Sequence, residues 1–265
     1  MTLTQNHGHD NHAKAPNPFL MAMEARAPWE WGAALAAWPM LRMAGMWPRP
    51  SHDAPHHVIV YPGLAAGDGS TGPLRGFLKD LGYEVHGWYQ GVNRGPRKGV
   101  LERMREQLIA VHRDYGEPVS LIGWSLGGVY AREIAKEVPH AVRNVITLGT
   151  PFAQSPRSTN AWRVYSMLSG ETLPDELMLH KLTVPPPAPF TSIYSKTDGV
   201  VAWQASIQKQ LANHPHGIEN IEVFASHLGI GANPAAWYAI ADRLAQPHDT
   251  WTPFVAPLGA RFLYG

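Results

Sequence analysis

Gly123-Trp124-Ser125-Leu126-Gly127 is the stretch around which the chain is organised. It follows an apolar run over residues 118–122 with the character of a strand, and it precedes residues 129–138, which have the composition of a helix. Gly-x-Ser-x-Gly between a strand and a helix is typical of a nucleophile elbow. The turn is so tight that the residues two before and two after the serine must be small, and both are glycine. The pattern predicts a strained Ser125 whose hydroxyl is exposed above the start of a helix.

Short apolar segments alternate with periodic segments on both sides of this motif. The alternation predicts strands at 57–61, 83–88, 118–122, 143–149, 190–194 and 218–224, and helices at 73–81, 97–115, 129–138, 204–212 and 234–245. Strands that alternate with helices in this way indicate βαβ units. Because segments 58–60, 119–122 and 145–148 are continuously apolar, we expect these strands to be buried on both faces. The expected fold is α/β, with a mostly parallel central sheet and helices on both faces.

Composition excludes several classes of protein and of chemistry. The 265 residues, 45% of them hydrophobic, are enough for one large domain with appendages. The net charge is +1 and the basic residues are dispersed, so the chain does not have the charge pattern of a nucleic-acid-binding protein. The absence of cysteine excludes disulfides, thiolate metal ligands and a cysteine nucleophile.

The chain divides into three parts. Residues 1–55 are expected to form a disordered tail, a helical extension and a linker. Residues 56–246 form the core, in which 153–189 break the alternation as a short cap or lid insertion, and 247–265 form a C-terminal tail without periodicity. Residues 1–12 lack the basic and apolar regions of a signal peptide. We therefore expect a cytoplasmic protein, either free or peripheral to a membrane or lipid surface.

Two segments near the N-terminus have alternative interpretations. His7, His9 and His12 form a His-rich tract, which we interpret as part of a polar tail rather than a metal site. Residues 29–47 are rich in Ala, Met and Trp but contain Glu30, Arg42 and Pro39, which makes a bilayer span a poor interpretation. This segment is either a helix packed on the domain or in a dimer contact, or an interfacial segment whose tryptophans contact lipid.

A serine hydroxyl becomes a nucleophile only when a base takes its proton and a carboxylate orients that base. In a parallel sheet, loops at the carboxyl ends of the strands converge on one edge. Asp198 follows the expected strand 190–194, and His227 follows the expected strand 218–224. The order Ser125, Asp198, His227 is the one expected for a fold that carries such an elbow.

Other residues compete for the same roles. His214 and His216 precede the last expected strand, where they are badly placed to serve as the base. The competing acids lie within the irregular insertion: Glu171, Asp175 and Glu176. We therefore assign the acid and the base to the two residues that directly follow strands.

The oxyanion of a tetrahedral intermediate requires preorganised N–H donors. The backbone N–H of Leu126 is one candidate, because it follows the nucleophile at the start of a helix. The second donor should come from the loop after strand 57–61, with Leu64 as first choice and Ala65 as second. Gly63 permits the unusual backbone conformation that such a loop needs.

Several motifs together resemble the α/β-hydrolase superfamily, and within it the bacterial esterases and lipases. They are Tyr61-Pro62-Gly63-Leu64, Gly123-Trp124-Ser125-Leu126-Gly127-Gly128, Thr147-Leu148-Gly149-Thr150-Pro151-Phe152, Asp198-Gly199-Val200-Val201 and Ser226-His227. The resemblance covers residues 57–245, and its Leu-Gly-Thr-Pro run is similar to that of many triacylglycerol lipases. Where these enzymes often have His-Gly at the oxyanion loop, this chain has Pro62-Gly63. The resemblance implies neither a metal nor an organic cofactor.

The expected activity is hydrolysis of carboxylic esters through a Ser-His-Asp triad and an acyl-enzyme. Apolar residues beside the triad predict a pocket for a hydrophobic acyl chain of a small-molecule or lipid ester: Ala65, Trp124, Val200, Val201 and Leu228. An acyltransferase or a polyester depolymerase would use the same triad with another acceptor or substrate. A non-catalytic binding protein of the same fold is a third interpretation, although such proteins usually lose a triad member.

Overall fold

The computed structural model describes residues 14–43, 47–50, 56–153, 182–210, 214, 216–247 and 250–265. Within these ranges the central sheet has six strands in the order β2-β1-β3-β4-β5-β6, and every neighbouring pair is parallel. The strands are β1 (His57–Tyr61), β2 (Glu84–His86), β3 (Val119–Trp124), β4 (Val142–Leu148), β5 (Phe190–Tyr194) and β6 (Ile218–Glu222). The predicted parallel sheet is confirmed.

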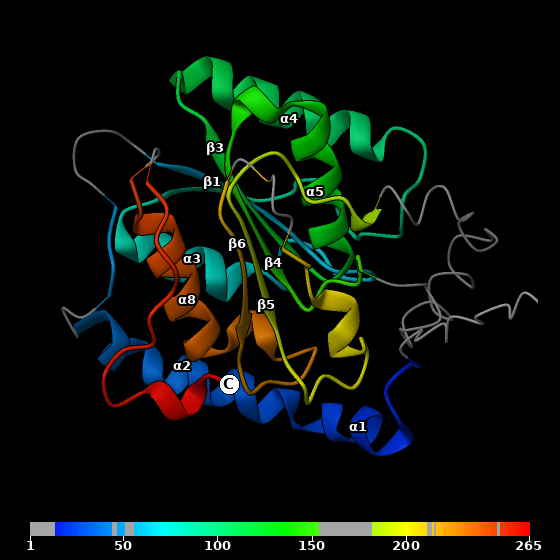
Figure 1. Cartoon of the computed structure of the whole chain (residues 1–265), viewed down its shortest axis with the longest axis vertical. Coiled ribbons are helices and arrows are strands. Elements are labelled where there is room, and N and C mark those ends of the chain that lie inside the picture. The colour runs from blue at the N-terminus through cyan, green and yellow to red at the C-terminus, as the bar shows by residue number, and fades with distance from the viewer. Residues whose placement is uncertain are drawn as a thin grey trace, which may run out of the picture.

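Helices cover both faces of the sheet (Figure 1). The main ones are α3 (Gly72–Leu81), α4 (Val100–Tyr115), α5 (Leu126–Glu137) and α8 (Pro234–Ala245). Phe77 of α3 and Trp237 of α8 belong to one buried apolar cluster. Met104 of α4 and Ile134 of α5 belong to a second cluster on the opposite face. Strands β1 and β3 contribute residues to both clusters, which explains their unbroken apolar sequences.

The elbow lies at the point in the sheet where the strand order reverses. β1 pairs with β2 on one side and with β3 on the other, and Tyr61 at the end of β1 is opposite Gly123. In open α/β sheets, ligands bind outside the carboxyl ends of strands at such a reversal. The loop after β1 and the turn after β3 are therefore neighbours, as the assignment of oxyanion donors requires.

One expected helix is absent from the described residues. In the segment predicted as helix 204–212, the described residues form only a 3₁₀ turn, η4 (Trp203–Ser206), which is followed by chain without regular secondary structure to Gln210. The cause is a long-range pairing that helix propensity does not reveal. The N–H of Gln208 donates to the side chain of Asn220 in β6 at 2.9 Å, and the Asn220 amide donates back to the Gln208 carbonyl at 2.9 Å.

The N-terminal extension packs on the core as three consecutive elements. They are α1 (Pro18–Met23), the 3₁₀ turn η1 (Glu24–Arg26) and α2 (Ala27–Met43), and they run along one end of the sheet (Figure 1). Pro28 lies in the first turn of α2, where its missing N–H has no intrahelical acceptor to lose, so it does not interrupt the segment. Among the described helices, none is long and apolar enough to cross a bilayer.

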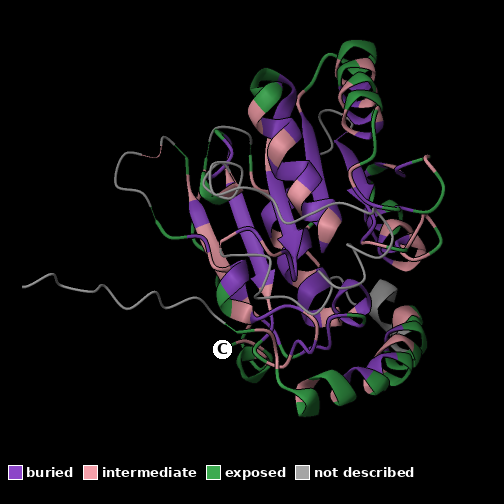
Figure 2. Cartoon of the chain, turned by 90° about the vertical axis from the view of Figure 1, so that its right-hand side faces the viewer, coloured by how far each residue is buried: buried purple, intermediate pink, exposed green. Residues whose placement is uncertain are grey.

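The tryptophans of this extension divide between two environments. Trp31, Trp38 and Trp47 pack against the buried cluster beneath α3 and α8. Trp29 is 83% exposed. Figure 2 shows many exposed residues along the N-terminal helices below the sheet. One face of α2 therefore packs on the domain, as one of the two interpretations predicts, whereas the other face is exposed. The His-rich tract at residues 7–12, linker residues 51–55 and insertion residues 154–181 lie outside the described residues.

Candidate active site

Ser125 occupies the turn between β3 and α5 with a strained backbone. Its φ of 52° and ψ of −120° lie outside the conformations that a serine normally adopts. The conformation is held by a hydrogen bond from the Ser125 N–H to the Leu148 carbonyl at 2.8 Å. Such strain persists only where the surrounding structure imposes it, and it is typical of functional sites.

The glycines of the elbow are required by close packing of backbone against backbone. A Cβ on Gly123 would overlap the backbone of Gly127 and Gly128. A Cβ on Gly127 would lie 2.7 Å from the Pro62 carbonyl oxygen, below any normal contact. The need for small residues at positions 123 and 127 was predicted from the sequence. Gly128 is equally constrained, because its added Cβ would overlap the Thr150 side chain.

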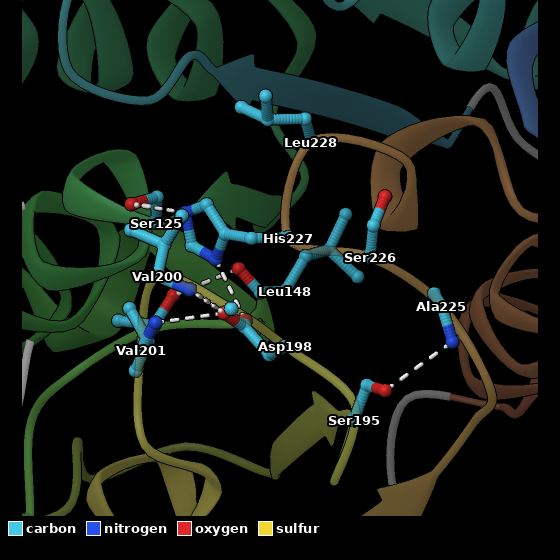
Figure 3. Close-up of polar contacts among 12 residues, drawn as sticks. Ser125, Leu148, Ser195, Asp198, Val200, Val201, Ala225, Ser226, His227 and Leu228 are labelled. Atoms are coloured by element: carbon cyan, nitrogen blue, oxygen red, sulfur yellow. Dashed lines mark hydrogen bonds and ion pairs between the residues drawn. The ribbon is translucent and has the colours of Figure 1, made fainter. Parts of the chain in front are cut away.

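The loops after β5 and β6 bring Asp198 and His227 to Ser125. The His227 Nε2 lies 3.0 Å from the Ser125 Oγ, and its Nδ1 lies 2.7 Å from the Asp198 Oδ2. Figure 3 shows the imidazole between the serine and the carboxylate. The other carboxylate oxygen of Asp198 accepts the N–H groups of Val200 at 2.8 Å and Val201 at 2.7 Å. All three residues are buried, so this line of hydrogen bonds is shielded from water, and Ser125 is not exposed as the sequence predicted.

The environment of His227 favours its protonated form. Burial is the largest single influence and by itself lowers the pKa of His227. The charge of Asp198, its hydrogen bond to the ring and the charge of Glu24 together outweigh burial and raise the pKa above its usual value. An imidazole that is readily protonated next to a fixed carboxylate is suited to accept the serine proton.

Gly149 forms the floor of the acid–base pair. Its φ is +53°, and an added Cβ would lie 3.1 Å from both the Asp198 Oδ2 and the His227 Nδ1. A side chain at this position would therefore press on the hydrogen bond between acid and base. This explains the glycine in the Leu-Gly-Thr-Pro run directly after β4.

The loop after β1 approaches the nucleophile from the opposite side. A Cβ on Gly63 would lie 3.3 Å from the Ser125 Cβ, which places the following Leu64 peptide next to the serine. The N–H of Ala65, the second choice of donor, is already bonded to the Asn93 carbonyl at 2.7 Å. Leu126 is the first residue of α5, where N–H groups have no intrahelical acceptor. Leu64 and Leu126 therefore remain the candidate oxyanion donors.

Asn93 supports this loop, and sequence reasoning missed it. It is fully buried, and its side-chain amide donates to the Pro62 carbonyl at 3.0 Å. Its backbone N–H also donates to the Ala66 carbonyl at 2.7 Å. The sequence of residues 91–96 predicts only a turn-rich loop, because a local pattern does not reveal that an asparagine will be buried against another loop.

The residues predicted to line the acyl pocket surround the triad in different ways. Trp124 is buried, and its indole N–H donates to the His227 carbonyl at 3.1 Å. The backbone amides of Val200 and Val201 hold Asp198, as described above. Ala65 is exposed with a φ of 60°, and Leu228 is 50% exposed beside the base. A role in lining an acyl pocket stays a prediction for all five.

The competing residues lie elsewhere. The His214 ring bonds to the backbone carbonyls of His216 at 2.7 Å and Pro186 at 3.0 Å. Glu171, Asp175 and Glu176 lie outside the described residues.

Side chains of the N-terminal extension hydrogen-bond to the acid and base loops, a role that the sequence did not predict: Glu24, Arg26, Glu30 and Trp31. From the sequence, Glu30 indicated only that the segment 29–47 is a poor membrane span. The available signal was the presence of two acids and an arginine close together, at positions 24, 26 and 30, in an otherwise apolar segment. Their partners are more than 170 positions away along the chain, so no local pattern identifies them.

Comparisons with known proteins identify the fold. No protein-family model and no curated protein sequence matches the chain. Among solved structures, a monoacylglycerol lipase of Paleococcus ferrophilus is similar at a TM-score of 0.53 and 17% identity, covering 75% of this chain and 96% of the lipase. Aspergillus fumigatus lipase B is similar at a TM-score of 0.58 and 18% identity, covering 76% of this chain and 56% of that lipase. An esterase domain from Rhodothermus marinus is similar at a TM-score of 0.52 and 22% identity, covering 74% of this chain and 90% of the domain. The chain has the α/β-hydrolase fold.

Proposed function

We propose that this protein is a serine-dependent carboxylic ester hydrolase that acts on hydrophobic acyl esters. The observation that carries the proposal is the continuous line from the Ser125 Oγ through both nitrogens of His227 to Asp198, at 3.0 and 2.7 Å. The likeness to solved lipases and esterases supports the fold in which this chemistry would take place. No residue of the proposed mechanism requires a metal or an organic cofactor.

In the acylation step, the Ser125 Oγ attacks the ester carbon while His227 Nε2 takes the serine proton. Asp198 holds the proton on Nδ1, so that Nε2 is free to accept, and it stabilises the imidazolium that forms. The carbonyl oxygen becomes an oxyanion that accepts hydrogen bonds from the N–H groups of Leu64 and Leu126. When the tetrahedral intermediate collapses, His227 returns the proton to the leaving alcohol and the acyl group remains on Ser125.

In the deacylation step, water takes the place of the alcohol. His227 removes a proton from water, and the resulting hydroxide attacks the acyl carbon of the ester on Ser125. The same two N–H groups stabilise the second oxyanion. Collapse releases the carboxylic acid and returns the proton from His227 to the Ser125 Oγ, which restores the starting state.

A hydrophobic substrate is supported by the surface beside the base. Leu228 follows His227 and is 50% exposed, and a hollow of about 520 Å³ next to it is lined mainly by apolar side chains of the N-terminal extension, among them Ala27 and Trp31. We propose that exposed residues of the segment 29–47, such as Trp29, contact aggregated lipid substrate. A rise in rate above the micelle threshold of the ester would identify a lipase, whereas saturation below that threshold would identify an esterase.

Ser125→Ala is expected to abolish hydrolysis of p-nitrophenyl esters while the chain remains folded, because alanine fits the elbow but offers no nucleophile. The measurement is kcat/KM over a series of acyl chain lengths, with circular dichroism to monitor folding. Removal of the serine nucleophile lowers kcat by about 10⁶-fold in enzymes that use this mechanism. Activity of the alanine variant close to that of the wild type would exclude Ser125 as the nucleophile.

A further inference from the structure

Glu24 is a buried acid that the mechanism above does not use. It lies in η1 and is only 8% exposed. Its Oε1 accepts the backbone N–H of Gly199 at 2.7 Å and that of His227 at 2.8 Å, and its Oε2 accepts the N–H of Leu228 at 3.0 Å. One carboxylate therefore joins the residue after the catalytic acid to the catalytic base and the residue after it.

The acid loop packs tightly against the backbone and the side chain of the N-terminal extension around Glu24. A Cβ on Gly199 would overlap the Leu20 carbonyl oxygen and would lie 2.9 Å from the Glu24 Cγ. The acid loop therefore approaches the N-terminal extension as closely as backbone permits. A buried carboxylate is tolerated only when hydrogen bonds replace its lost hydration, and the three N–H groups supply that replacement.

Neighbouring residues of the extension reinforce the same two loops. Arg26 donates to the Thr197 carbonyl at 3.1 Å and to its hydroxyl at 2.8 Å, one residue before Asp198. Glu30 accepts the Ser226 N–H at 3.0 Å and also bonds to the Ser226 hydroxyl, one residue before His227. Arg26 and Glu30 are themselves paired at 2.9 Å.

The extension also holds the residue that follows the base. The indole N–H of Trp31 donates to the Leu228 carbonyl at 2.7 Å. Together with Glu24, it fixes both backbone polar groups of Leu228, and it does so from an element distant in sequence. Hydrogen bonds to the base itself and to residues next to the acid and base are more specific than the docking of a helix requires, because apolar packing alone would attach α2.

We propose that Glu24 is a positioning residue of the active site, which holds the Asp198 loop and the His227 loop at a fixed separation. The inference rests on the proposed function, since it concerns the alignment of the same base. With both loops fixed, the imidazole stays within reach of Ser125 and Asp198 at once. Small displacements of a base lower the rate strongly, because proton transfer depends on alignment.

The charge of Glu24 has a second consequence, at His227. Four charged side chains lie on the elements packed against His227: Asp198, Glu24, Arg26 and Glu30. Lys196 of the acid loop pairs with Glu222 at 2.6 Å. Burial lowers the pKa of His227, whereas Asp198 and then Glu24 raise it. Loss of the Glu24 charge should therefore lower the pKa of His227 and move the acid limb of the rate profile to lower pH.

The test compares Glu24→Gln with a control that weakens docking of the same extension elsewhere. Trp38→Phe serves as this control, because it removes the bond from the Trp38 indole to Asp80 at 2.9 Å but touches neither loop. We measure kcat, KM and the pH profile with p-nitrophenyl butanoate, and the melting temperature of each variant. For Glu24→Gln we expect kcat to fall about 100-fold at little changed KM, with the acid limb displaced to lower pH. For Trp38→Phe we expect only a lower melting temperature.

Two results would overturn the inference. One is a Glu24→Gln variant with the kcat and acid limb of the wild type, and the other is an equal loss of kcat in Glu24→Gln and Trp38→Phe. If Glu24→Gln does not fold, Glu24→Asp replaces it. Aspartate keeps the charge but is too short to bridge both loops, so we expect the acid limb of the wild type with a reduced kcat, and wild-type kcat would contradict us. A wild-type chain without Ser125-dependent turnover would instead contradict the proposed function.

Discussion

Asp198→Asn is expected to lower kcat about 10⁴-fold, as loss of the orienting acid does where a histidine serves as base. The hydrogen bonds around Asp198 make the reason specific. Its Oδ1 is fixed as an acceptor by the N–H groups of Val200 and Val201. The asparagine oxygen must take that position, so its NH₂ group takes the position of Oδ2, 2.7 Å from the His227 Nδ1.

That arrangement selects the wrong tautomer of the base. An NH₂ group donates to Nδ1, so the imidazole must carry its proton on Nε2. Nε2 then faces the Ser125 Oγ as a donor and cannot accept the serine proton. The folded state should change little, because the amide has the shape of the carboxylate.

The measurement is kcat of Asp198→Asn against the matched control Glu222→Gln. Glu222 is a carboxylate of β6 that pairs with Lys196 and accepts the Tyr194 hydroxyl at 3.3 Å, without contact to the triad. Both substitutions remove one negative charge. We expect the control to retain its kcat within a small factor. Equal losses in the two variants would show that the effect is one of net charge and would contradict the tautomer argument.

Gly123→Ala is expected to destabilise the protein by about 3 kcal/mol or more, which is at the upper end of the effect of overpacking. The added methyl group would overlap backbone atoms of Gly127 and Gly128, not the flexible end of a side chain. Gly123 also pairs with Tyr61 on one side and Thr147 on the other, so β3 cannot move away from the clash. The elbow must deform, and activity should be lost together with stability.

Gly32→Ala is the matched control for this prediction. Gly32 lies in α2, is exposed, and an added Cβ meets nothing within 4 Å. Alanine is favoured over glycine in a helix interior by about 1 kcal/mol, so this variant should be slightly more stable. Urea unfolding measures both free energies. A Gly123→Ala variant as stable as the wild type would mean that the turn is not as tight as described.

The sequence predicted the parts of the site that follow from periodicity. Asp198 and His227 each follow a predicted strand, and a parallel sheet brings the carboxyl ends of its strands to one edge. Ser125 lies between two glycines that only a tight turn requires. These signals are local, because strand, turn and helix are each encoded within about ten residues.

The remaining features depend on contacts between distant segments. Gln208 was expected in a helix, but its backbone bonds to the side-chain amide of Asn220 in β6. Asn93 looked like a turn residue, yet it is buried under the loop after β1. Glu24 lies 203 positions before His227, within residues 1–55, which were predicted only as a tail, a helical extension and a linker. Polar residues whose partners are this remote leave no periodic signal in a single sequence.

The identity of the nucleophile is the central claim, and covalent labelling tests it most directly. A fluorophosphonate probe reacts with a serine only where a base activates it and an oxyanion site stabilises the adduct. After labelling of the folded wild-type chain and of Ser125→Ala, mass spectrometry of the peptides locates the adduct. We predict one adduct, on Ser125, in the wild type and none in the variant. A wild-type chain with unmodified Ser125, or a variant labelled to the same extent, would contradict the account.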